Sequence, residues 1–342
     1  MFAQDVVFDS ESTHGKVASL FDNAEFVEEE YEYERRTLRI IIQERLYPLK
    51  TLTNVKDIAQ TLVDVSCSTC FYFFSPWWRC AHDGLVHRWL YERVGILHRD
   101  LSLNNIMCRI IEGRNDAGVT EKKVYGVLTD YDLSSWTASL TPDYTKTSQQ
   151  RTGTPPFMAR GLLDGTDNLH LYRHDVESLF YIMLILATHY EIQAPKEGEE
   201  GGVRLRQGLK KLPYQEWFDQ PSCKALANSK KAFFSDFEDL DLSPGFEDFG
   251  CWLKALRVSF RRAIRSKQIY EEGPMSPQQE DGATEGGVIP TFDNETLAGH
   301  IRYPALIGPV SDLKGKLGGL VIRYGLSKPS PTTSAGAAQA GA

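Results

Sequence analysis

Val94-Gly-Ile-Leu-His-Arg-Asp-Leu-Ser-Leu-Asn-Asn-Ile-Met107 is the segment that decides how this sequence is interpreted. It places Asp100 five positions before Asn105, with apolar residues on both sides. A carboxylate and an amide held on a short loop between buried flanks can orient a hydroxyl group and a metal ion in one pocket. A lone His-Arg-Asp triplet is also common in solvated turns, so the prediction of a catalytic loop depends on the residues downstream of it.

Two later segments support that prediction through their order. They are Thr129-Asp-Tyr-Asp-Leu133 and Arg151-Thr-Gly-Thr-Pro-Pro-Phe-Met-Ala159. The opening segment, Val94–Met107, has the spacing of H-R-D-L-x-x-x-N, which is the catalytic loop of protein kinases. Because the three signals occur in the order found in kinases, the sequence resembles that class.

Composition limits the types of partner and the cellular compartments that are expected for this protein. The 342 residues are 42% hydrophobic, which is enough for a sizeable core. The net charge of -8 comes from 46 acidic and 38 basic side chains without a dense basic block, so nucleic acid is not expected as the main partner. No signal peptide or membrane-length apolar run is recognisable, and six cysteines do not make a disulfide framework. We therefore expect an intracellular protein that does not bind membranes.

The residues before the loop predict a strand and then a helix. Leu38-Arg-Ile-Ile-Ile-Gln43 has the pattern of a buried strand, and the turn-prone residues 44–49 come next. A helix is expected over 53–64, because Asn54 can cap it and apolar residues recur at helical spacing. The acidic run Glu28–Glu34 is expected to be a solvated face or a disordered arm.

Residues 66–85 interrupt the helical pattern. They contain three cysteines, a proline and the pair Trp77-Trp78. Joining Val65 to Val86 would produce one amphipathic helix, so the insert is interpreted as a translated intron or a loop particular to this protein. A zinc site at Cys67, Cys70, Cys80 and His82 is the alternative that the ligand types leave open.

The residues after the loop predict a hairpin and several helices. Met107–Ile111 and Val124–Thr129 are strand-like runs around a polar turn, and a hairpin there would carry Asp130 to the mouth of the cleft that contains the loop. The apolar run over 173–190 predicts a helix buried on every side, with an exposed loop after it at 194–202. Further helices are expected over 214–218, 223–234 and 246–272.

Four segments together resemble the fungal-type protein kinase family. They are Leu97–Met107, Gly126–Leu133, Arg151–Ala159 and Tyr172–Tyr181, and Glu295–Tyr303 resembles the family's segment after the kinase core. The resemblance implies an α+β protein kinase-like fold, consisting mainly of the helical large lobe with an incomplete small β lobe. It also implies ATP and magnesium as cofactors and transfer of phosphate to Ser or Thr of a protein substrate whose identity is unknown.

The resemblance also assigns roles to individual residues. Asp100 would position the acceptor hydroxyl, and Asn105 and Asp130 would ligate magnesium. His98 and Arg99 would support the loop. Asp175 would brace the loop by accepting its backbone N–H groups, and Thr154 would line the acceptor site and hydrogen-bond Asp100.

The same interpretation predicts the domain boundaries. Residues 1–49 are a remnant of the small lobe and the hinge, and residues 50–275 are the large lobe. Residues 276–310 are a linker and the family's C-terminal segment. Residues 311–342 are a tail that is disordered from about 328 because its composition cannot bury a core.

Four departures from the kinase pattern bear on activity. Ser102 replaces the usual Lys, Asp132 replaces the Gly of Asp-Phe-Gly, and Gly161 replaces the Glu of Ala-Pro-Glu. No G-x-G-x-x-G loop or Val-Ala-Ile-Lys strand precedes residue 37, where only Lys16 is a faint candidate. The alternatives to an active kinase are therefore a catalytically impaired pseudokinase that acts as a binding module, or a truncated kinase fragment.

Overall fold

The computed structural model describes residues 2–6, 38–42, 45–67, 87–114, 118–137, 153–195, 198, 201–220, 222–236, 238–272 and 292–322. The chain divides into an N-terminal unit, Met1–Leu46, and a C-terminal unit, Tyr47–Ala342. In the N-terminal unit, β1 (Phe2–Val6) pairs antiparallel with β2 (Leu38–Ile42). The strand predicted from residue 38 is confirmed, whereas β1 was not anticipated.

The C-terminal unit contains a three-stranded sheet in the order β3-β5-β6. The strands are β3 (Tyr47–Pro48), β5 (Ile106–Arg114) and β6 (Thr120–Leu128). The predicted hairpin is confirmed, because β5 and β6 pair antiparallel with Ile106 opposite Leu128. Asn105 and Thr129 thus flank the open end of this hairpin.

Helix α2 (Val55–Cys67) packs against this hairpin. The predicted cap is present, since the Asn54 side chain accepts a hydrogen bond from the Asp57 N–H at 2.8 Å. A Cβ at Gly126 would lie 2.2 Å from the Thr61 carbonyl oxygen, so only glycine permits this approach of strand to helix. The helix includes Ser66 and Cys67, which had been expected to belong to the insert.

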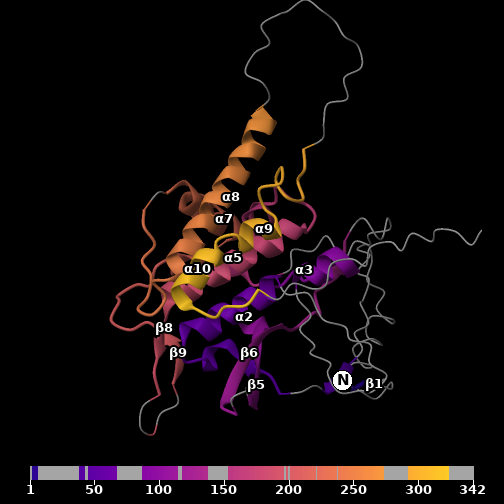
Figure 1. Cartoon of the computed structure of the whole chain (residues 1–342). Helices are drawn as coiled ribbons and strands as arrows, with labels where there is room; N and C mark the ends of the chain where they lie inside the picture. Colours follow the sequence, from indigo (N-terminus) through magenta and orange to yellow (C-terminus); the bar gives the residue numbers. More distant parts are fainter. Residues whose placement is uncertain are drawn as a thin grey trace, which may run out of the picture. The chain divides into compact units, whose positions relative to one another are not determined.

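Helix α5 (Tyr172–His189) is the centre of the core, and all of its residues are buried. The predicted helix is confirmed, although it ends one residue early because Tyr190 adopts extended backbone angles. Within the C-terminal unit, Figure 1 shows α2 between the β5–β6 hairpin and α5, with α8 (Phe249–Glu272) beyond α5. An apolar helix without a polar face is stable only in such an enclosed position.

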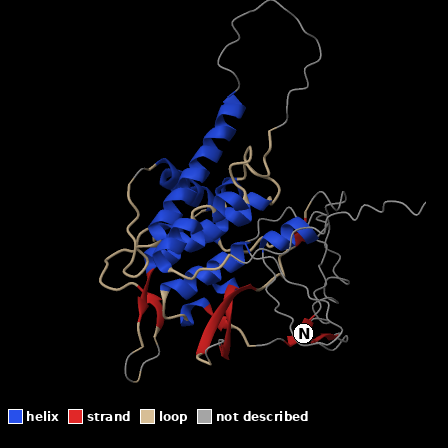
Figure 2. Cartoon of the chain, in the orientation of Figure 1, coloured by secondary structure: helices blue, strands red, loops and turns tan. Residues whose placement is uncertain are grey.

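The other expected helices are also present. Helix α6 (Glu216–Asp219) is shorter than expected and starts later, while α7 (Cys223–Ser235) and α8 lie close to the predicted ranges. The loop expected at 194–202 connects an unpredicted hairpin, β8 (Tyr190–Gln193) and β9 (Gly202–Leu205). Figure 2 shows both hairpins on the same side of the helices of this unit.

The remaining short elements are η1 (Leu49–Thr51), α3 (His87–Trp89), η2 (Leu90–Val94), β4 (Ile96–Leu97), η3 (Leu103–Asn105), β7 (Ser135–Trp136), η5 (Pro155–Phe157) and α4 (Arg160–Asp164).

The packed C-terminal segment extends beyond residue 310, after which a tail had been expected. Helices α9 (Tyr303–Ile307) and α10 (Val310–Leu317) bury Val310 and Leu313 completely. Two hydrogen bonds of 2.9 Å join Val321 to the Gln60 side chain of α2. Residues 292–322 are therefore part of the C-terminal unit.

Several sequence-based expectations lie outside the described residues. These are Lys16, the acidic run at 28–34, residues 68–85 of the insert with the three other candidate zinc ligands, the linker before residue 292 and the tail from 323. The described side chains contain no group of three or more His, Cys, Asp or Glu residues arranged to hold a metal ion. In the described part of the chain, no helix has both the length and the apolarity that a membrane crossing requires.

Candidate active site

The predicted catalytic loop runs from β4 to η3 and is hydrogen-bonded to the central helix α5. The Asp175 carboxylate accepts the backbone N–H of His98 at 2.9 Å and that of Arg99 at 3.1 Å. Arg99 has a φ of 71°, in the left-handed region that residues with a side chain seldom adopt. The two hydrogen bonds stabilise this turn, and they are the brace that the sequence had led us to expect from Asp175.

The Asp175 carboxylate also lies between two imidazoles that the sequence had not indicated. Nε2 of His87 is 2.8 Å from one carboxylate oxygen, and Nε2 of His170 is 2.7 Å from the other. The Tyr303 hydroxyl lies 2.8 Å from Nδ1 of His87. Burial acts to raise the pKa of Asp175, but the charges and hydrogen bonds of His170 and His87 lower it well below the ordinary value.

The Asp100 carboxylate is oriented by one residue of the Arg151–Ala159 segment. Its Oδ1 accepts the Thr154 backbone N–H at 2.9 Å and the Thr154 hydroxyl at 3.0 Å. The hydrogen bond expected between these side chains is therefore present. Since both contacts use Oδ1, the second carboxylate oxygen has no hydrogen bond within the described part of the chain, and it can accept one from a substrate hydroxyl.

Asn105 and Asp130 are brought to the same end of the β5–β6 hairpin. The Asn105 carbonyl oxygen accepts both the Thr129 N–H at 2.9 Å and the Thr129 hydroxyl at 3.1 Å. The next residue, Asp130, has an exposed side chain and a φ of 64°. Backbone pairing therefore places Asp130 directly after a residue that is hydrogen-bonded to the end of the predicted catalytic loop.

The Asn105 amide is oriented so that its oxygen is available. Its Nδ2 donates to the Asp100 carbonyl oxygen at 2.8 Å, and its Oδ1 has no hydrogen bond in the described structure. Magnesium takes one or two carboxylates together with other oxygen atoms, and it keeps several water or phosphate ligands. The Asn105 Oδ1 and the exposed Asp130 carboxylate fit that donor set.

His98, which was expected to support the loop, contacts the residues on either side of Asp130. Its Nε2 lies 2.9 Å from the Thr129 carbonyl oxygen, and its ring contacts that of Tyr131 with 4.8 Å between centroids. Burial lowers its pKa, so the neutral imidazole is favoured. The side chain links the predicted catalytic loop to the turn that contains Asp130.

Two buried residues that the sequence had not indicated anchor the segment around Thr154. Lys230 of α7 donates from Nζ to the Met158 carbonyl oxygen at 2.5 Å, and Glu177 of α5 accepts the Arg160 backbone N–H at 2.8 Å. Lys230 is fully buried, with Nζ 4.0 Å from the centre of the Tyr181 ring. A single lysine in a helical pattern gives no sequence signal for such a contact.

The absence of the Ala-Pro-Glu glutamate also has a structural explanation. At Gly161, a Cβ would lie 1.7 Å from Oδ2 of Asp167. The Asp167 carboxylate forms ion pairs with Arg173 at 2.7 Å and with Lys267 of α8 at 3.2 Å, and its Oδ2 lies 3.2 Å from Nε2 of His174. A carboxylate from a neighbouring turn thus occupies this position, and glycine leaves space for it.

This arrangement has the order and spacing of a protein kinase catalytic site: a catalytic Asp, an Asn five residues later and a second Asp after a hairpin. Residues 84–187 match the family model described as Fungal protein kinase. The resemblance to that family is therefore confirmed for this segment. No curated protein and no solved structure matches the chain.

Proposed function

We propose that this protein has a kinase-like fold and transfers phosphate from ATP to Ser or Thr hydroxyl groups of proteins. The observation that carries this proposal is the Asp100–Thr154 pair, in which Thr154 orients the Asp100 carboxylate while the Asn105 amide binds the Asp100 carbonyl oxygen. In this proposal, the C-terminal unit corresponds to the large lobe of a kinase. The match to the fungal protein kinase model supports the same assignment.

Asp100 would accept the hydrogen bond, and then the proton, of the attacking hydroxyl. Thr154 holds one carboxylate oxygen at 2.9 and 3.0 Å, so the other can face the acceptor. Because phosphoryl transfer depends mostly on positioning and charge stabilisation, this fixed orientation is the main contribution of the loop. A Thr at this position also supports Ser or Thr as the acceptor.

Asn105 and Asp130 are the residues that would hold magnesium through their side-chain oxygens. When bound, the ion supplies positive charge next to the phosphate oxygens. Asn105 contributes a neutral oxygen whose direction is set by the Nδ2 contact to Asp100, and Asp130 contributes a negative charge from an exposed turn.

A second candidate function is a non-catalytic binding module. It is favoured by the sequence, which contains no glycine-rich loop and no Val-Ala-Ile-Lys strand before residue 37. Without these parts, the α- and β-phosphates lack their usual protein contacts. The two candidates share one fold and differ only in phosphate transfer.

The test is transfer of labelled phosphate from Mg·ATP to mixed Ser- and Thr-containing proteins, measured over long incubations. We expect slow transfer to Ser and Thr that is lost in Asp100→Asn and retained in the matched control Asp132→Asn. Asp132 is exposed and lies outside the contacts described above. No transfer by folded wild-type protein would reject catalysis, as would transfer that Asp100→Asn leaves unchanged.

A further inference from the structure

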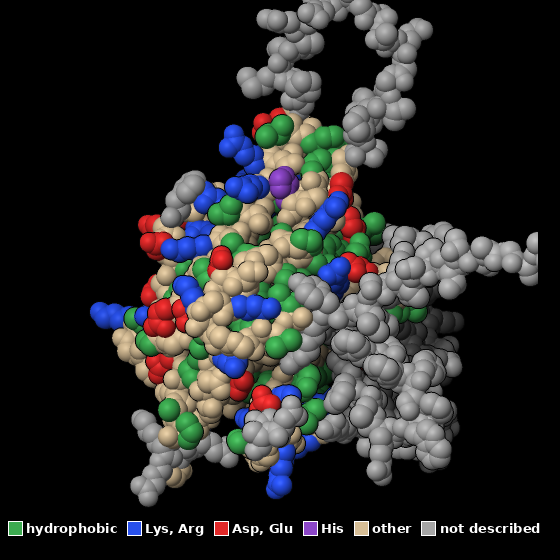
Figure 3. Space-filling model, viewed as in Figure 1, with side chains coloured by type: hydrophobic (Ala, Val, Ile, Leu, Met, Phe, Trp, Pro, Cys, Tyr) green, Lys and Arg blue, Asp and Glu red, His purple; other side chains and the backbone are tan. Residues whose placement is uncertain are grey.

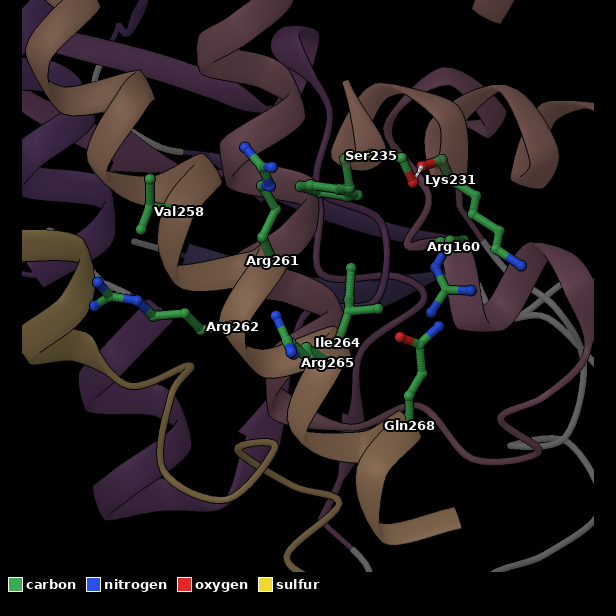
Figure 4. Close-up of a pocket in the computed structure, with 10 residues that line it drawn as sticks. Arg160, Lys231, Ser235, Val258, Arg261, Arg262, Ile264, Arg265 and Gln268 are labelled. Carbon is green, nitrogen blue, oxygen red and sulfur yellow. Dashed lines mark hydrogen bonds between the residues drawn. The ribbon is translucent and has the colours of Figure 1, made fainter. Parts of the chain in front are cut away.

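A pocket lies between helices α4, α7 and α8. Its volume is about 660 Å³. Figure 4 shows its lining residues, which come from the start of α4, the end of α7 and the middle of α8. They are Arg160, Lys231, Phe234, Ser235, Val258, Arg261, Arg262, Ile264, Arg265 and Gln268.

Positive charge is concentrated here in a chain whose net charge is negative. Half of the lining residues are Lys or Arg, and none is acidic. Helix α8 alone carries six basic side chains and two acidic ones, and both acids lie in its last turn. On the face shown in Figure 3, Lys and Arg side chains gather over α7 and α8. We call this feature the basic pocket.

Three of the basic side chains are available to a ligand. Lys231, Arg262 and Arg265 are exposed, and none of them forms an ion pair with another described residue. By contrast, Arg160 is 3.4 Å from an Asp164 carboxylate oxygen. Like-charged neighbours on one surface repel each other, so an anionic partner would relieve an existing cost.

The basic pocket also has an apolar part. Phe234 is almost completely buried beneath it, Ile264 is half-buried, and Val258 is 41% exposed. A surface with cations around apolar groups suits a peptide that carries both acidic and apolar side chains. An inorganic anion would leave the apolar part uncovered.

The arrangement of the cations favours several carboxylates over one phosphate. In Figure 4, Arg160 and Lys231 lie on one side of the pocket and Arg262 on the opposite side, with Arg261 and Arg265 between them. Groups distributed in this way match acidic residues spaced along an extended segment. Arg can bind each carboxylate through two parallel hydrogen bonds.

The basic pocket is linked through the chain to the segment that orients Asp100. Arg160 directly follows Ala159, the last residue of the segment whose Thr154 orients Asp100. Lys231 follows Lys230, which holds the Met158 carbonyl oxygen of the same segment. A polypeptide held in the pocket would therefore lie near the segment that lines the acceptor position.

We propose that the basic pocket binds an acidic segment of a polypeptide substrate. Its role with a substrate rests on the function proposed above, whereas acidic-peptide binding does not depend on catalysis. The net charge of -8 disfavours nucleic acid as the occupant, because domains that bind nucleic acid usually carry an overall positive charge.

The experiment measures binding of a fluorescein-labelled peptide of alternating Glu and Leu by fluorescence anisotropy, with a Gln/Leu peptide as the neutral control. The test variant is Lys231→Glu with Arg265→Glu. The matched control is Lys224→Glu with Lys254→Glu, which changes the charge equally on the same two helices outside the pocket. Circular dichroism verifies that both variants fold.

We expect the Glu/Leu peptide to bind the wild type and the control variant similarly, and the test variant roughly tenfold more weakly. Affinity should decrease with added salt. Equal loss in both double variants would overturn the proposal, as would equal binding of the Gln/Leu peptide. Tighter binding of a single-stranded oligonucleotide, lost in the same test variant, would overturn the choice of a polypeptide.

The role with a substrate has a separate readout. Fusing the Glu/Leu segment to a Ser-containing acceptor should lower its KM for the wild type and leave kcat unchanged, because docking adds uniform binding. Peptide binding without this change in KM would overturn the substrate role alone. Absence of any phosphate transfer would reject the proposed function and leave the binding measurement intact.

Discussion

Asp175 joins the catalytic loop, the central helix and the C-terminal segment through one buried carboxylate. It accepts two backbone N–H groups of the loop and contacts His87, which in turn contacts Tyr303. Removing the charge from a buried, paired position leaves its partners without compensation. The functional geometry of the loop and the stability of the domain therefore depend on the same residue.

We predict that Asp175→Asn lowers the free energy of unfolding by about 3–5 kcal/mol, the usual cost of breaking a buried ion pair. Urea denaturation measures this change. The matched control is Asp241→Asn, in which an exposed carboxylate loses its ion pair with Arg206, and it should cost at most about 1 kcal/mol. Equal effects of the two substitutions would contradict the central role of Asp175.

His174 makes stability depend on pH. It is completely buried, its Nδ1 accepts the Leu171 N–H at 2.9 Å, and its Nε2 faces Asp167. Burial lowers its pKa to about 3 from an ordinary value of 6.5. Because the unfolded chain gains this proton near pH 6.5 and the folded chain does not, stability is lost as pH falls below 6.5.

One such histidine accounts for about 2 kcal/mol between pH 7.5 and pH 5. We therefore predict that wild-type protein loses at least this much stability over that interval and that His174→Gln loses measurably less. Urea denaturation at the two pH values provides the comparison. Asp167 and Asp175 act in the same direction only below about pH 4, because their pKa values are lowered from 3.8. An identical loss in His174→Gln would assign the pH dependence to other groups.

Gly161 and Gly315 allow a matched test of local packing. A Cβ at Gly161 would overlap Asp167, whereas nothing lies within 4 Å of a Cβ at Gly315 in α10. We predict that Gly161→Ala lowers the melting temperature, at a cost of about 1–3 kcal/mol. Gly315→Ala should raise stability by up to about 1 kcal/mol through helix propensity. Destabilisation by Gly315→Ala alone would contradict this account.

At the scale of elements, the sequence predicted those that have a strong local pattern. Apolar spacing and the Asn54 cap identified α2, and the long apolar run identified α5. The β8–β9 hairpin was missed because the composition of residues 194–202 indicated only an exposed loop, and the four-residue strands on either side are too short to show an alternating pattern. Short strands are stabilised by their contacts, and β9 packs against η1 far away in the sequence.

Central burial of α5 predicts a severe effect of a charge within it. Leu184 is fully buried, so Leu184→Asp should cost several kcal/mol and prevent cooperative folding. Ile269→Asp is the control on α8, because that side chain is 59% exposed, and its effect should be below about 0.5 kcal/mol. Soluble Leu184→Asp protein that melts like the wild type would contradict this placement of α5.

The candidate site was also predictable only where the local sequence carries a recognisable pattern. Asp100, Asn105, Thr154 and Asp175 lie in segments whose spacing is characteristic, and their contacts could be named beforehand. His87, Lys230 and Asp167 could not, because each acts through a partner distant in the sequence or through a backbone carbonyl. His87 is 88 positions from Asp175, and Lys230 is 72 positions from Met158.

At the scale of the whole molecule, two kinds of information point in different directions. The C-terminal unit assembles Asp100, Thr154, Asn105 and Asp130, whereas the sequence provides no recognisable glycine-rich loop or strand lysine for the phosphates. Positioning of the acceptor and positioning of the nucleotide are separate requirements of phosphoryl transfer. Under the function proposed above, phosphoryl transfer by this chain should therefore be limited by nucleotide binding.

We predict that the 342-residue chain binds Mg·ATP with a dissociation constant above about 1 mM, which is the upper end of ordinary KM values. We also predict that it transfers phosphate slowly. Isothermal titration with Mg·ATP measures the affinity, and Asp130→Ala serves as the comparison. Without a lysine on the α- and β-phosphates, the γ-phosphate would point imprecisely even when Asp100 is correctly oriented. Micromolar affinity and rapid transfer, both abolished by Asp130→Ala, would contradict this prediction and would require a phosphate-binding lysine or arginine elsewhere in the chain.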